Sequence, residues 1–218
     1  MSTDRALVAI DGLDGSGKSQ FARALAEACE AEGEPTAVLR VDDFRRPLGP
    51  LPSGADEAAI YYERYYDFAA LDACLAQFFA GAPSAFVPRF DPAREIVDGQ
   101  QELRWGGTRL AILEGVFVLR ATNVTRAPLI VLEVSEAEAR RRVLARDQGR
   151  GRPVEVVEHR MENRYFPAQR RYRTEFDPAR RADVVIDNEL WDAPRIVRCE
   201  SARLPRSVEK ALRTVVRS

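Results

Sequence analysis

The stretch Gly12-Leu13-Asp14-Gly15-Ser16-Gly17-Lys18-Ser19 decides the fold expected for this chain. It matches the phosphate-binding loop pattern, in which glycines let the backbone curl so that successive N–H groups face phosphate oxygens. The stretch follows a short apolar run at residues 6–10 and opens a segment with helical periodicity at residues 17–31. Because a strand before the loop and a helix after it are the context that the pattern requires, we expect nucleoside triphosphate binding.

Lysine is almost absent from the rest of the chain. Lys18 and Lys210 are the only lysines among the 33 cationic side chains, and arginine supplies all the others. We expect Lys18 to reach the β- and γ-phosphates of ATP and the Ser19 hydroxyl to bind Mg²⁺. The other nucleotide contacts expected from the loop are Gly12, Asp14, Gly15, Ser16, Gly17 and Gln20.

Composition excludes several classes of protein. The chain has 218 residues, 45% of them hydrophobic, and a formal net charge of −1, which argues against a broad nucleic-acid surface. No apolar stretch reaches the roughly 18 residues of a membrane helix. The three cysteines lack metal-ligand spacing, so we expect a reduced cytoplasmic setting. The single histidine, His159, argues against a zinc site and a Ser-His-Asp hydrolase.

Apolar, non-alternating runs recur along the chain between helical segments, a pattern typical of parallel strands covered on both faces. The expected strands are residues 6–10, 36–41, 110–113, 129–134 and 184–186. The expected helices are residues 17–31, about 56–79, an arginine-rich region from 136 to about 174, and 208–216. We therefore expect an α/β chain with the P-loop NTPase fold and a five-stranded parallel sheet with helices on both faces.

Two segments depart from this alternation. Residues 86–90, 95–97 and 102–105 are short and β-prone, with Asp98-Gly99 between them, so we expect a β-hairpin insert over about residues 85–108. Ser135 with Glu138 three residues later is a capping-box signature at the start of the arginine-rich region. We expect one domain over residues 1–218, with this region forming a lid at about residues 140–153.

Two carboxylates limit the reactions that the expected nucleotide site could catalyse. Asp42 and Glu114 each follow an expected strand, and the carboxyl ends of parallel strands meet where such folds bind ligands. One carboxylate can hold Mg²⁺ while the other accepts a proton from an attacking hydroxyl, which suits phosphoryl transfer to an alcohol. The structural alternatives are a turn or helix-cap role for Asp42 and a buried salt bridge for Glu114. No Asn-Lys-x-Asp guanine motif and no Leu-Ser-Gly-Gly transporter signature is present.

With these motifs the chain resembles the uridine kinase-like branch of P-loop kinases, which includes phosphoribulokinase and pantothenate kinase. The segments that carry the resemblance are Gly12 to Ser19, Val41-Asp42-Asp43-Phe44, Tyr66-Asp67-Phe68, Val87-Pro88-Arg89-Phe90-Asp91, Ile112-Leu113-Glu114-Gly115, Arg141 to Asp147 with Arg150-Gly151-Arg152, and Ala182-Asp183-Val184-Val185-Ile186. They occur in the family's order over most of the chain.

The resemblance implies a role for each matching position. Asp42 would be the general base, and Ser19, Asp42 and Glu114 would form the magnesium site. Lys18 and Arg146 would act in catalysis. The lid arginines that close over the phosphates would be Arg142, Arg146 and Arg152. Asp67 would hold ribose hydroxyls, with Tyr66 and Phe90 flanking a base and Arg94 on the same acceptor side.

The resemblance is incomplete on the acceptor side. Asp91 is followed by Pro92-Ala93-Arg94 instead of a base-reading histidine, Phe68-Ala69-Ala70 replaces a His-Pro pair, and Arg45 stands where the family has tyrosine. The leading hypothesis is an ATP- and Mg²⁺-dependent kinase of a nucleoside such as uridine or cytidine. A kinase of a sugar, glycerate or pantothenate-like alcohol is the alternative within the class.

A nucleotide-binding regulator or nucleic-acid-binding ATPase is the alternative from another class. We expect the protein to bind a small-molecule acceptor and to bind neither nucleic acid nor a membrane. The sequence leaves undecided whether the protein forms a homo-oligomer.

Overall fold

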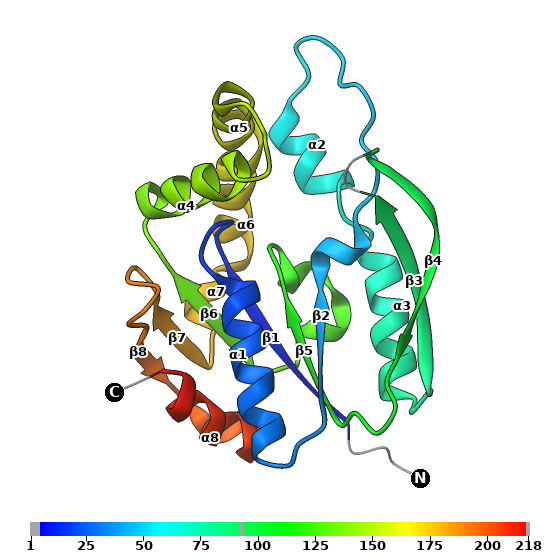
Figure 1. Cartoon of the computed structure of the whole chain (residues 1–218), viewed down its shortest axis with the longest axis vertical. Coiled ribbons are helices and arrows are strands. Elements are labelled where there is room, and N and C mark those ends of the chain that lie inside the picture. Colours follow the sequence, from blue (N-terminus) through cyan, green and yellow to red (C-terminus); the bar gives the residue numbers. More distant parts are fainter. Residues whose placement is uncertain (1–4, 92–93, 217–218) are drawn as a thin grey trace.

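A six-stranded sheet in the order β2-β5-β1-β6-β7-β8 forms the centre of the molecule (Figure 1). The structure is a computed structural model that describes residues 5–91 and 94–216. The strands are β1 Ala6–Gly12, β2 Thr36–Arg40, β5 Leu110–Glu114, β6 Leu129–Glu133, β7 Val184–Asp187 and β8 Arg195–Cys199. The first five of these are parallel, as predicted. β8 pairs antiparallel with β7 and was missed, because its largely exposed side chains form no buried apolar run.

Side chains alternate along each central strand and so build a core on each face of the sheet. Val8 and Ile10 of β1 face α1 and α8, whereas Leu7 and Ala9 face the opposite side, where α3 and α6 pack. The helices are α1 Lys18–Ala31, α2 Glu57–Arg64, α3 Phe68–Phe79, α4 Glu136–Gln148, α5 Val154–Arg160, α6 Phe166–Phe176, α7 Pro178–Arg181 and α8 Arg206–Val215. Within the described ranges, no helix is both long and apolar enough to cross a membrane.

The single helix expected over residues 56–79 is divided into α2 and α3. The backbone between them pairs with a distant segment: Asp67 N–H donates to the Phe44 carbonyl at 2.7 Å, and Arg46 N–H donates to the Tyr65 carbonyl at 2.7 Å. The Asp67 carboxylate then caps α3 by accepting from Ala70 N–H at 3.0 Å. The sequence did not predict this break, because the residues on both sides of it have helical periodicity. The break results from the backbone pairing with residues 44–46.

The predicted hairpin is present as a separate two-stranded sheet of β3 Ser84–Asp91 and β4 Ile96–Arg104. The sequence suggested that Asp98-Gly99 forms the turn of this hairpin. In the structure these two residues instead lie inside β4. Asp98 forms an ion pair with Arg89 of β3 at 2.8 Å, beside a shift in the strand register. The turn lies between β3 and β4, where residues 92–93 are outside the described part of the chain.

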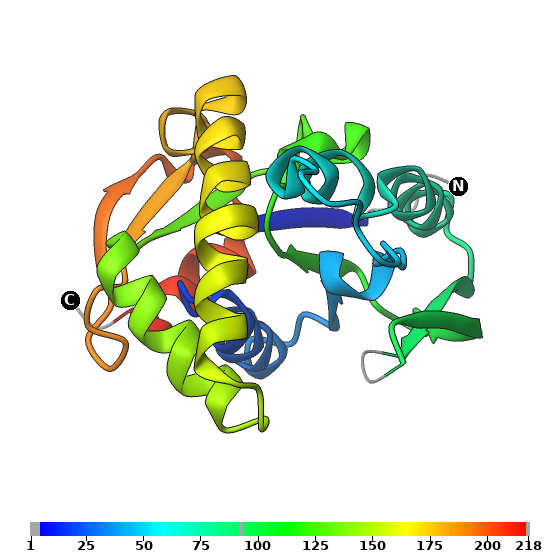
Figure 2. The same ribbon diagram turned by 90° about the horizontal axis from the view of Figure 1, so that it is seen from above.

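The arginine-rich region folds into helices over the carboxyl ends of the strands. Figure 2 shows α5, a π-helical turn (Met161–Tyr165) and α6 as one continuous helix, crossed by α4. Ser135 caps α4 as predicted, with its side chain accepting from Glu138 N–H at 3.1 Å. The reciprocal half of the capping box is absent, because Ser135 N–H donates to Glu189 at 2.7 Å while Glu138 binds Arg141 and Arg142.

Two strand ends approach each other closely where the chain has a glycine. A Cβ atom at Gly115 would lie 2.5 Å from both Cβ and Cγ2 of Val41. Gly115 directly follows Glu114, and Val41 directly precedes Asp42, so this close packing sets how near the two carboxylates can lie. The register places Arg40 and Ile10 opposite Glu114 on either side of β5.

We expect Gly115→Ala to lower the free energy of unfolding by about 1–3 kcal/mol, because the added methyl group would overlap buried Val41. The matched control is Gly107→Ala, since a Cβ at Gly107 meets no atom within 4 Å. Urea unfolding of both variants measures the difference. Equal stability of the two variants would show that the 110–116 segment relaxes without cost.

Candidate active site

A cleft of about 630 Å³ opens at the carboxyl ends of β1, β2 and β5. This is the edge at which the sequence predicted ligand binding. The phosphate-binding loop and the strand ends contribute Asp14, Lys18, Ser19, Arg40, Asp42, Glu114, Gly115 and Val116. The hairpin, the α2 region and the lid contribute Arg45, Tyr61, Tyr65, Tyr66, Phe90, Glu95, Arg146, Arg150, Arg152, Arg160 and Tyr165.

The phosphate-binding loop turns directly into α1. Gly17, at the N-cap, has φ 90°, a left-handed conformation that glycine adopts readily. The ammonium group of Lys18 is folded back on the loop and donates to the carbonyls of Gly12 at 3.0 Å and Leu13 at 2.7 Å. Ser16 is fully buried, and its hydroxyl has no partner among the described residues. The loop therefore carries unsatisfied hydrogen-bonding capacity at its centre.

Two carboxylates face the loop from neighbouring strands. Glu114 is 4% exposed and accepts a hydrogen bond from the Ser19 hydroxyl at 2.8 Å. Burial raises the pKa of Glu114, although Lys18 and the Ser19 hydroxyl oppose the rise. Asp42 is more exposed and accepts from the Tyr66 hydroxyl at 3.2 Å. Burial raises the pKa of Tyr66 well above its usual value, so this phenol stays a neutral donor to Asp42.

The lid arginines are held by two carboxylates. Arg146 binds Asp14 of the loop at 2.9 Å and Asp147 at 2.8 Å. Arg152 binds the other oxygen of Asp147 at 2.8 Å, and Arg150 lies 3.8 Å from the same side chain. Burial alone would raise the pKa of Asp147, but the adjacent guanidinium groups of Arg146 and Arg152 outweigh it and lower that pKa. Asp147 therefore anchors these arginines next to the loop.

Eight residues expected at the site are not among those that line this cleft. Four of them belong to the phosphate-binding loop: Gly12, Gly15, Ser16 and Gly17. The remaining four make other contacts or are exposed. Arg142 braces the loop after β7 by donating to the carbonyls of Asn188 and Glu189 at 2.8 and 2.9 Å. Asp67 caps α3 and pairs with Arg46 at 2.6 Å. The other two are Gln20 and Arg94, both exposed.

The cleft also contains residues that sequence reasoning did not assign. Arg45 stacks on Phe90 with its Cζ 4.8 Å from the ring centroid. The only indication in the sequence that Arg45 lies at the site was that it stands where the family has tyrosine. Tyr65, Tyr165 and Arg160 carried no signal, since each lies in a helical or turn segment with no motif. The expected position of a base-reading histidine, at Pro92-Ala93, lies outside the described residues.

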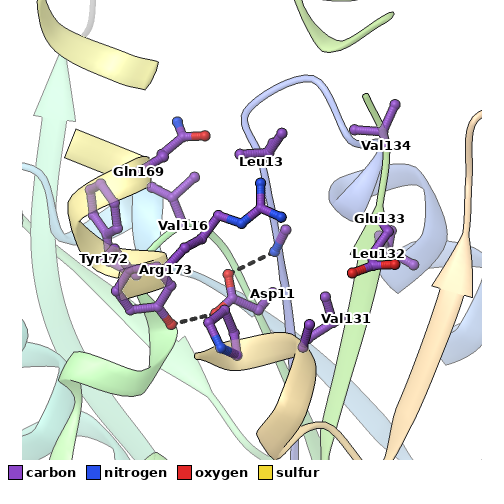
Figure 3. Close-up of a pocket in the computed structure, with 14 residues that line it drawn as sticks. Asp11, Leu13, Val116, Val131, Leu132, Glu133, Val134, Gln169, Tyr172 and Arg173 are labelled. Atoms are coloured by element: carbon purple, nitrogen blue, oxygen red, sulfur yellow. Dashed lines mark hydrogen bonds between the residues drawn. The ribbon is translucent and has the colours of Figure 1, made fainter. Parts of the chain in front are cut away.

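A second, smaller cavity of about 50 Å³ lies behind the phosphate-binding loop, between β1, β6 and α6 (Figure 3). Asp11 at its floor is 2% exposed and accepts hydrogen bonds from Gly12 N–H at 2.7 Å and from the Tyr172 hydroxyl. Gln169 accepts from Asp14 N–H at 3.1 Å, so α6 contacts the loop directly. Burial raises the pKa of Asp11 to about 6, with the Tyr172 and Gly12 hydrogen bonds opposing the rise.

The raised pKa of Asp11 predicts a pH-dependent loss of stability. The folded protein holds this proton to about pH 6, whereas an unperturbed aspartate releases it near 3.8, so ionising Asp11 destabilises the fold as pH rises between these values. Between pH 4 and 7 we expect the wild type to lose about 1–3 kcal/mol relative to Asp11→Asn. Urea unfolding at several pH values measures this difference. Asp56→Asn, an exposed helix cap, is the control, and parallel pH profiles for all three proteins would contradict the prediction.

The chain is similar to several proteins of known structure. No model of a known protein family and no curated protein matches the chain. The fold is similar to that of a possible uridine kinase from Bacillus stearothermophilus, with 23% identity, a TM-score of 0.64, and coverage of 83% of this chain and 88% of that one. A D-glycerate 3-kinase from Cryptococcus neoformans var. grubii aligns at 15% identity and a TM-score of 0.51, covering 75% of this chain and 77% of its own.

A closer likeness in sequence is to a provisionally assigned fructose transport system kinase from Silicibacter sp. TM1040. It is 26% identical, with a TM-score of 0.62, and the alignment covers 78% of this chain and 85% of that one. The order of elements, the phosphate-binding loop and the hairpin insert agree with this likeness. The chain is therefore similar in structure to the uridine kinase-like branch of P-loop kinases, which are small-molecule phosphotransferases.

Proposed function

We propose that this protein transfers the γ-phosphoryl group of ATP to a hydroxyl group of a small molecule in a Mg²⁺-dependent reaction. The observation that supports this best is the Ser19–Glu114 hydrogen bond of 2.8 Å, which lies in the same cleft as Lys18 and Asp42. Hydroxyl and carboxylate oxygens are the ligands that Mg²⁺ prefers, so the donor set fits this ion. Ser19, Glu114 and Asp42 would hold it, and when bound it would neutralise charge on the phosphates.

The loop side of the cleft suits a triphosphate. Lys18 now donates to two loop carbonyls, and these contacts can be exchanged for phosphate oxygens without moving α1. Ser16, buried and unpartnered, adds a further donor within the loop. Arg146 and Arg152 stand beside the loop and supply permanent positive charge for the transferring group.

We propose Asp42 as the general base. It accepts the proton of the acceptor hydroxyl as the acceptor oxygen bonds to the γ-phosphorus. The bond from that phosphorus to the β,γ-bridging oxygen breaks, and ADP leaves with the electron pair. The Tyr66 hydroxyl, 3.2 Å from Asp42 Oδ1, orients the carboxylate toward the cleft.

For the acceptor, a non-nucleoside alcohol is the better candidate. Asp67, expected to hold ribose hydroxyls, is occupied by α3 and Arg46 and does not line the cleft. The similar structures are named for uridine, fructose and glycerate, so the fold accommodates each class in other proteins. A nucleoside is the second candidate, favoured by the aromatic walls of Tyr65, Phe90 and Tyr165.

Acceptor-dependent ADP release tests the function directly. The panel contains uridine, cytidine, fructose, ribose, glycerate and pantothenate, with ATP or GTP as donor and the phosphorylated product identified by mass spectrometry. We expect ADP and phosphorylated acceptor in equal amounts with at least one non-nucleoside. ATP binding without acceptor-dependent release would instead favour a nucleotide-binding regulator. A gel shift with a steep salt dependence would favour a nucleic-acid-binding ATPase.

We expect Asp42→Asn to lower turnover by about 10²–10⁴-fold, because the amide cannot take the proton of the attacking hydroxyl. ATP affinity measured without Mg²⁺ should change little, since the loop is untouched. The matched control is Asp43→Asn, because neighbouring Asp43 pairs with Arg40 at 2.6 Å and does not line the cleft. Steady-state kinetics and ATP titration separate the two effects, and near-wild-type turnover in Asp42→Asn would rule out the base assignment.

A further inference from the structure

The cationic side chains of the cleft fall into two groups that differ in how they are paired. On the side of the phosphate-binding loop, Arg146 and Arg152 each lie within 2.9 Å of a carboxylate oxygen. Arg40, at the end of β2, pairs with Asp43 at 2.6 Å. These cations are neutralised in the protein and stand where the triphosphate is expected.

Arg45 and Arg160 also line the cleft, and neither has an ion pair shorter than 3.8 Å among the described residues. Arg45 donates through Nε to the Asp42 carbonyl at 2.8 Å, and no ion pair with a carboxylate is found for it among the described residues. Arg160 has one ion pair, with Glu95 at 3.8 Å, and that glutamate side chain is 63% exposed. The Arg160 side chain itself is 27% exposed, so much of its charge is shielded from water without a close partner.

The surroundings of these two arginines strengthen their charges. Tyr65, Phe90 and Tyr165 line the cleft beside these arginines and lower the local dielectric constant there. A further cavity of about 220 Å³ shares these three rings and Arg160. A cation beside low-dielectric walls attracts an anion more strongly than a cation on an open surface does.

We infer that the acceptor carries a negatively charged group, a phosphate ester or a carboxylate, that Arg45 and Arg160 bind on the side of the cleft away from the loop. The inference rests on the proposed function and adds the chemical class of its acceptor. Guanidinium groups offer several N–H donors in a planar fork that matches either oxyanion. A neutral acceptor would leave Arg45 without an ion-pair partner and Arg160 with only its 3.8 Å contact to Glu95, so it would gain no charge-assisted hydrogen bond from either guanidinium group.

Matched pairs of acceptors test this inference. The members of each pair differ in charge and share all hydroxyl groups except the one that the charged group replaces or esterifies: glycerate and glycerol, ribose 5-phosphate and ribose, fructose 6-phosphate and fructose. With wild-type protein we expect kcat/KM to be at least about tenfold higher for the charged member of the pair that reacts best. The glycerate pair reports on a carboxylate and the sugar phosphate pairs on a phosphate ester.

The arginine assignment is tested with Arg160→Gln. We expect KM for the charged acceptor to rise about tenfold to a hundredfold, with kcat and KM for ATP nearly unchanged. Arg160→Lys should retain part of the preference, which separates lost charge from a folding defect, and Tm is measured for each variant. The matched control is Arg170→Gln, since Arg170 pairs with Glu136 at 2.5 Å outside the cleft.

The possible failures can be told apart. Turnover that prefers the neutral member of every pair overturns the inference and leaves the kinase proposal intact. An equal effect of Arg160→Gln on both members of the reacting pair overturns the assignment of the anion to this side of the cleft. No acceptor-dependent ADP release with any compound overturns the proposed function, and the inference with it.

Discussion

The close packing of Gly115 against Val41 is the constraint on which the candidate active site depends. Glu114 and Asp42 adjoin these two residues, and the third essential element, the phosphate-binding loop, begins where β1 ends. Strand register places Ile10 and Arg40 opposite Glu114, so all three elements leave the sheet at one level. A methyl group at position 115 would sit 2.5 Å from Val41, and relieving that overlap would separate the carboxylates. The spacing of these two candidate metal-binding carboxylates thus depends on glycine, which has no side chain, at position 115.

The ion pairs of the lid are suited to exchange. Arg146 and Asp14 have side chains that are 38% and 24% exposed, so their interaction is partly screened by water. Pairs of this kind contribute about 0–1 kcal/mol, which a triphosphate can replace at little cost. Asp147, 1% exposed, behaves differently, because leaving it unpaired would be expensive. If a bound phosphate replaced Asp14 as the partner of Arg146, the ion pair of Arg146 with Asp147 would still connect the lid to this site.

The sequence predicted the parallel sheet, the phosphate-binding loop and the Ser135 cap, because each depends on local pattern or on burial of apolar runs. It did not predict the break between α2 and α3, which arises from backbone pairing of Tyr65 and Asp67 with the distant residues 44–46. The sequence also did not predict which groups the Asp67 and Arg142 side chains contact. A residue in a matching motif can be taken up by a helix cap or a neighbouring loop, and periodicity carries no information about that choice.

Different structural elements form the part of the cleft proposed to bind ATP, the donor half, and the part proposed to bind the acceptor, the acceptor half. Backbone N–H groups, strand ends and a buried glutamate form the donor half, so the core of the sheet determines its shape. The proposed acceptor half includes the tyrosines of the α2 region, of which Tyr61 and Tyr66 belong to the main core, and the charged residues Arg45 and Arg160, which do not. Substitutions there alter the charge of the pocket at little cost to folding. Acceptor choice can therefore diverge while the sheet, the loop and the metal-binding carboxylates stay in register.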